Sequence, residues 1–79
     1  MRYHDQVVDD VVSQRRRGWS WALVHQFLFR ADHLRFRNPW FCFELYYAFV
    51  HQLGMPCCEA EDVLRQWFAE DVLRRASEL

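Results

Sequence analysis

Apolar residues recur at helical spacing from the start of the chain. The first set consists of Val7, Val8, Val11 and Val12. Two acids lie between these valines and Gln residues lie on either side of them, which predicts an amphipathic helix over residues 3–16. Three arginines then suit the negative end of the helix dipole, and Gly18 is a natural stop.

A second helix is predicted over residues 20–36, with Ser20 as its N-cap. The stripe that we expect to be core follows positions i, i+3, i+4, i+7 and i+10, and consists of Val24, Phe27, Leu28, Ala31 and Leu34. Other large apolar residues lie away from this stripe, so the helix is apolar on more than one face. It should end near Phe36 or Arg37, because Asn38 precedes a proline and is biased out of the helical region.

The third predicted helix, residues 39–53, has the clearest boundaries. Asn38 is a good N-cap, Pro39 suits the first helical position, and Gly54 follows the end. Apolar and mostly aromatic side chains surround the helix on nearly every side, from Trp40 to Leu53. A helix of this kind should be central, with neighbours on most sides.

A fourth helix is predicted over residues 57–76, with acids in its first turn and arginines in its last. The segment Ala60–Arg65 recurs letter for letter nine residues later as Ala69–Arg74. Nine residues rotate a helix by two and a half turns, so in a straight helix the two copies face opposite ways. The second face is a candidate dimer interface, with a fraying tail, a second intramolecular contact or a bend near Ala69 as the alternatives. Its residues are Val72, Leu73, Ala76 and Leu79.

Together these elements predict an all-α fold, a compact four-helix domain over residues 1–79 with a central aromatic-rich helix. The chain is 52% hydrophobic and 18% aromatic. Each aromatic side chain buries roughly 150–250 Å² when it is enclosed. So small a domain has little interior to enclose them all, and we expect some of them to lie in an interface.

The sequence carries no pattern typical of catalysis or of cofactor binding. Two glycines leave no phosphate-cradling loop. The four His and three Cys residues lack the spacing of a zinc site, so no metal is expected. A cysteine near His51 has no third group to orient it as a nucleophile. We therefore expect neither an enzyme nor a bound cofactor.

Several features favour the cytoplasm. Charged residues interrupt the N-terminal region before any apolar run of secretory length, so no signal peptide is expected. Cys57 and Cys58 are adjacent, a poor geometry for an ordinary disulfide, which suits reduced thiols. The longest apolar stretch, residues 39–53, would be about 22 Å long as a helix, too short for a bilayer. No membrane insertion is expected.

Charge is distributed unevenly along the chain. All ten basic residues are Arg, and the net charge is −1. Residues 15–37 nevertheless sum to +5, because six Arg face one Asp, whereas residues 59–79 sum to −3. Arg and Trp are enriched at interface hot spots, and they cluster in the basic segment. This predicts a partner-binding surface for an acidic protein, or for the acidic last helix of a second copy. Its residues are Arg15, Arg16, Arg17, Trp19, Trp21, Phe29, Arg30, Arg35, Phe36 and Arg37.

The alternative is DNA binding, because the arginine run followed by Val24 and Leu28 is similar to the entry of a helix-turn-helix. That pattern requires a small residue, a turn glycine and an apolar anchor at three further positions. The chain has His25, Phe29 and Arg35 there. Nucleic acid is therefore the less favoured partner.

In size, in its lack of lysine and in its lack of a catalytic motif, the chain resembles the small inhibitor proteins that phages and mobile elements of GC-rich bacteria make against host machinery. The resemblance lies in general character rather than in a residue motif. It implies a non-catalytic protein that binds a host protein in the host cytoplasm and occludes it. A defence complex, a transcription regulator and a pilus motor ATPase are examples of such targets.

Overall fold

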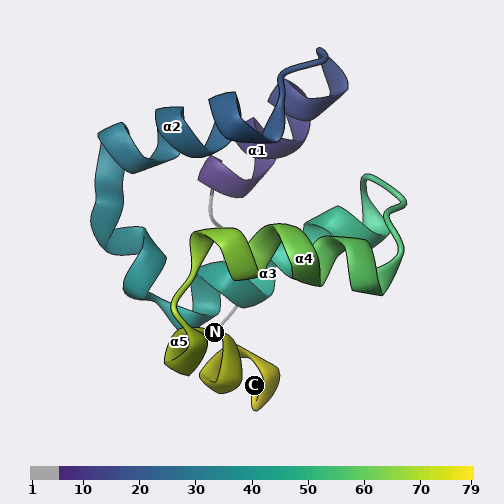
Figure 1. Ribbon diagram of the computed structural model, residues 1–79. Coiled ribbons are helices and arrows are strands. Elements are labelled where there is room, and N and C mark those ends of the chain that lie inside the picture. The colour runs from purple at the N-terminus through teal and green to yellow at the C-terminus, as the bar shows by residue number, and fades with distance from the viewer. Residues whose placement is uncertain (1–5) are drawn as a thin grey trace.

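The computed structural model describes residues 6–79, and over this range the chain is helical with no strand (Figure 1). The elements are α1 (Gln6–Arg16), α2 (Trp21–Asp32), the 3₁₀ segment η1 (His33–Arg37), α3 (Pro39–His51), α4 (Cys57–Trp67) and α5 (Glu70–Ser77). The predicted all-α class is confirmed. The predicted count of four helices is not, because two of the predicted helices are each divided. The predicted start of the first helix at residue 3 lies outside the described residues.

The boundaries of α3 follow the local signals in the sequence. Asn38 accepts a hydrogen bond from the backbone N–H of Trp40 through its side chain, at 2.9 Å, and Pro39 occupies the first turn. At the other end Gly54 has a φ of +69°, a left-handed conformation that favours glycine. Local chemistry therefore determines where this helix starts and stops.

The second predicted helix is divided at Asp32. This residue has a φ of −164° and a ψ of 86°, and its carboxylate accepts from the backbone N–H of Leu34 at 3.2 Å. Short polar side chains that bond the nearby backbone compete with helical hydrogen bonds. The chain continues as η1, which turns Phe36 into the core.

The last predicted helix is divided at Phe68 and Ala69, both of which have extended backbone. Phe68 is buried, with its ring 5.2 Å from that of Phe36 and 6.1 Å from that of Phe41. The bend separates α4 from α5 and changes the direction of the chain. As a result α5 packs back against α3.

Helix α3 is central, with α1, η1, α4 and α5 packed against it. Phe41, Leu45 and Phe49 on α3 are at most 2% exposed. Helix α2 lies beside α1 at one end of the molecule (Figure 1) and contacts mainly α1 and η1. One side of α2 is therefore left without a covering helix. None of the described helices is both long and apolar enough to cross a membrane.

Candidate protein-binding surface

The turn between α1 and α2 is fixed by its own hydrogen bonds. Gly18 has a φ of +94°, and the backbone N–H of Trp19 donates to the carbonyl of Gln14 at 3.0 Å, as in a Schellman motif. Ser20 then caps α2 by accepting from the N–H of Leu23 at 3.1 Å. These contacts hold the arginine run next to the first turn of α2.

The three arginines of this run lie in different surroundings. The Arg15 guanidinium lies 4.1 Å from the ring centroid of Trp21 and donates to the carbonyl of Trp19. Arg16 donates to the carbonyl of Gln52 at 2.9 Å, which ties α1 to the end of α3. Arg17 is exposed and forms no side-chain hydrogen bond or ion pair within the described residues. Of the three, Arg17 is the one fully available to a partner.

The two tryptophans of the predicted surface also differ. Trp21 is half-buried, and its ring lies 4.8 Å from that of Phe49 and 5.7 Å from that of Trp67. Its ring is therefore part of the wall of the core, and its role in the partner-binding surface stays a prediction. Trp19 is half-buried with its ring edge-on to Phe27 at 5.9 Å, and it remains at the surface.

The second predicted cluster, around η1, is brought only partly to the surface. Phe36 is 7% exposed and packs in the core, so its assignment to the partner-binding surface is wrong. The cause is the start of η1 after Asp32, which turns this ring inward. Arg35 is half-buried, pairs with Asp32 at 3.4 Å and lies over the ring of Phe41. The residues of the cluster that are exposed are Phe29, Arg30 and Arg37.

The predicted dimer face is also corrected. Val72 and Ala76 are 6% and 7% exposed and belong to the chain's own core, while Leu73 is half-buried against it. The bend at residues 68–69 rotates α5 so that its apolar side packs against α3. The second face of the repeat therefore makes a contact within the chain, one of the alternatives to a dimer interface. Leu79 stays exposed at 51%.

The largest departure from the sequence prediction lies on α2. Val24 and Leu28 are buried as expected, but Phe27 and Leu34 are 50% and 58% exposed, and Ala31 is exposed as well. The exposed side of α2 carries residues four positions apart, an arrangement that we call the exposed stripe. It consists of Leu23, Phe27 and Ala31 on α2, together with the half-buried Trp19 just before the helix. The available sequence signal was that this helix is apolar on more than one face.

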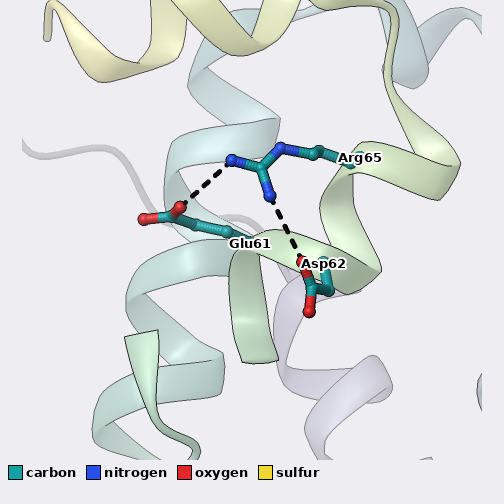
Figure 2. A network of polar contacts seen from close by, with 3 residues as sticks. All are labelled: Glu61, Asp62 and Arg65. Atoms are coloured by element: carbon teal, nitrogen blue, oxygen red, sulfur yellow. Dashed lines mark hydrogen bonds and ion pairs between the residues drawn. The ribbon is translucent and has the colours of Figure 1, made fainter. Parts of the chain in front are cut away.

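A groove of about 590 Å³ lies between α3, α4 and α5. Its floor includes the buried Cys42 and Leu64. Two of its charged lining residues, Glu61 and Arg65, pair at 3.5 Å, and Arg65 also pairs with Asp62 at 3.2 Å (Figure 2). The lining carries both signs of charge, so it does not favour a ligand of either sign.

The pKa values of three side chains, two in the groove and one on α2, are shifted by their surroundings. Burial raises the pKa of the Cys42 thiol to about 11, which keeps it protonated at neutral pH. A hydrogen bond between the Tyr46 and Cys57 side chains raises the pKa of Tyr46, with burial and nearby negative charge acting in the same direction. On α2, burial lowers the pKa of His25, whose ring stacks on that of Trp67. Within residues 6–79 no group of three His, Cys, Asp or Glu residues could hold a metal ion.

No protein-family model matches the chain, and neither the curated proteins nor the solved structures contain a significant match. The candidate surface is therefore defined by geometry alone: the exposed stripe on α2, with exposed arginines at both of its ends.

Proposed function

We propose that this chain is a small, non-catalytic protein-binding module whose contact surface is the exposed stripe of α2. The observation that carries this proposal is the exposure of two large apolar side chains, Leu23 at 45% and Phe27 at 50%, one turn apart on a helix whose other side is in the core. Contiguous apolar side chains on the surface of a small protein are typical of interaction sites.

Two further features support a binding role. The ring of Phe27 is edge-on to that of Trp19, a contact that favours a defined arrangement of the aromatic part of the stripe in the free protein. Such preorganisation lowers the entropic cost of binding. Side chains of this size, next to arginines, also resemble the hot spots of known interfaces.

The biological role that fits such a module is stoichiometric inhibition. A protein of this size acts by covering a surface of its target, and the composition resembles that of inhibitors from phages and mobile elements. We propose a host protein as the target, in the classes expected from the sequence: a defence complex, a transcription regulator or a pilus motor ATPase. The module would act in the cytoplasm of the host.

The DNA-binding alternative receives less support. A helix-turn-helix would need its turn at Phe29, whereas α2 continues without a break from Trp21 to Asp32. The exposed stripe is also apolar, while contacts to phosphates are made by charged and polar groups.

The experiment that tests the proposed function is affinity capture from a bacterial lysate, with and without nuclease, read by mass spectrometry. Tagged wild type is compared with Phe27→Glu and with Tyr47→Glu, a control at an aromatic residue of α3 that is 55% exposed. We expect a stoichiometric protein that wild type and Tyr47→Glu retain after nuclease treatment and that Phe27→Glu loses. Equal capture by all three chains, or loss of the partner with nuclease, would contradict the proposal.

A further inference from the structure

The exposed stripe has the dimensions of a site for one helix. From Leu23 to Ala31 it spans nine residues, a rise of about 12 Å or a little over two helical turns. Its side chains project from a single helix at a spacing of four residues. A ridge of this kind fits the groove between side chains of a second helix laid along it.

The charges of the segment that carries the stripe, residues 15–37, are mainly of one sign. Arg17 and Arg30 lie near its two ends, both are exposed, and neither has an ion pair within the described residues. The single acid among residues 15–37 is Asp32, which is already paired with Arg35. A partner with carboxylates beside its apolar side chains would match this surface, and a basic partner would be repelled.

A second copy of the chain offers a poorer match to this surface. Two α2 helices placed face to face would bring like charges together, Arg30 near the arginines of the other copy. The chain's own acidic helices, α4 and α5, keep their apolar side chains in the core, and Leu79 is the large apolar residue exposed near them. Helix α3 exposes Trp40 and Tyr47, at 52% and 55%, but carries a single acid, Glu44. A helix of another protein, with several acids beside its apolar side, therefore matches the stripe better.

We propose that the partner binds through an acidic amphipathic helix, which lies along α2 with its apolar side on the exposed stripe and its Asp or Glu residues next to Arg17 and Arg30. This inference rests on the proposed protein-binding function and adds the chemistry of the partner. The helical form is favoured because the described part of the chain has no strand edge to which an extended peptide could add.

The test is a selection from a displayed library of helical peptides. Leucines are held at i, i+3, i+4 and i+7, and the flanking positions vary among Glu, Gln and Lys. Wild type is the bait, and the support without protein is used for counter-selection. We expect Glu to be enriched at the flanking positions. A selected peptide should then bind Phe27→Glu and Arg30→Glu about tenfold more weakly or worse, and Tyr47→Glu as well as wild type.

Several results would overturn the inference. Enrichment of Lys or Gln would show that the partner is not acidic. Peptides that bind wild type and Phe27→Glu equally, or no enrichment at all, would show that the stripe does not take a helix. A dimer of the free protein in light scattering, lost in Phe27→Glu, would show that a second copy covers the stripe. The proposed function is judged separately, because the capture experiment does not depend on the form or charge of the partner.

Discussion

Three consecutive residues of the same type can have three different roles. Arg15 stacks on Trp21 and bonds a carbonyl, Arg16 connects α1 to the end of α3, and Arg17 makes no such contact. The planar guanidinium explains the first role, because it can stack on a ring and donate hydrogen bonds in its own plane. Position relative to the core, rather than residue type, decides which arginine is structural.

We predict that Arg15→Lys lowers the free energy of unfolding by about 1 kcal/mol, because an ammonium keeps the charge but loses the planar stacking on Trp21. Arg17→Lys is the matched control and should change stability by less than about 0.5 kcal/mol. Urea titration followed by tryptophan fluorescence measures both. Equal effects of the two substitutions would mean that the stacked contact does not contribute to stability.

At the scale of elements, the bend at Phe68 and Ala69 explains how both copies of the repeated segment bury their apolar side chains. In a straight helix the two copies would face opposite ways, but the bend turns the second copy, so that Val63 and Val72 are both buried in one core. Burial of the Phe68 ring favours the bend. The bend also makes Ala69 the N-cap residue of α5, and alanine has no side chain that could accept a hydrogen bond from the first turn.

We predict that Ala69→Ser raises the free energy of unfolding by about 0.5–1 kcal/mol, because the new hydroxyl can accept from a free backbone N–H of the first turn of α5. Ala22→Ser, the same change at an exposed position in the first turn of α2, is the control and should change stability by less than about 0.5 kcal/mol. Urea midpoints measured by far-UV circular dichroism compare the two. A loss of stability in Ala69→Ser would show that the N-terminus of α5 is already satisfied.

At the scale of the whole molecule, stability and binding involve different sides of the same set of helices. The core is built around α3, whose Leu45 is completely buried. Helix α2 contributes Val24 and Leu28 to that core and keeps the exposed stripe outside it. Substitutions on the stripe should therefore affect binding without unfolding the protein.

We predict that Leu45→Ala lowers the free energy of unfolding by about 2–5 kcal/mol, because it removes buried methyl groups and leaves a cavity. That is a large part of the total for a domain of this size, about 4–12 kcal/mol. Leu23→Ala, the matched control on the stripe, should change stability by less than about 0.5 kcal/mol. If both variants lost comparable stability in urea titration, Leu23 would be a core residue and unavailable to a partner.

Local signals in the sequence predicted most of the helical structure. The boundaries set by Gly18, Asn38, Pro39 and Gly54 are observed, because capping and backbone preference act within a few residues. The central position of α3 was also predictable, since a helix that is apolar on all sides must be covered on most of them. Of the candidate site, the sequence indicated the α1–α2 junction, where Trp19 and Arg17 remain at the surface.

The sequence by itself therefore determined the helical class, the ends of the best-capped helices and the identity of the central one. Tertiary structure decided which apolar faces are covered. Periodicity shows that Val24, Phe27 and Leu28 share a side of α2, but not how far the neighbouring helices reach across it, and they stop short of Phe27. Tertiary structure also decided the bends at Asp32 and at residues 68–69. Phe36 and Phe68 enter the core only when distant segments supply the rings around them.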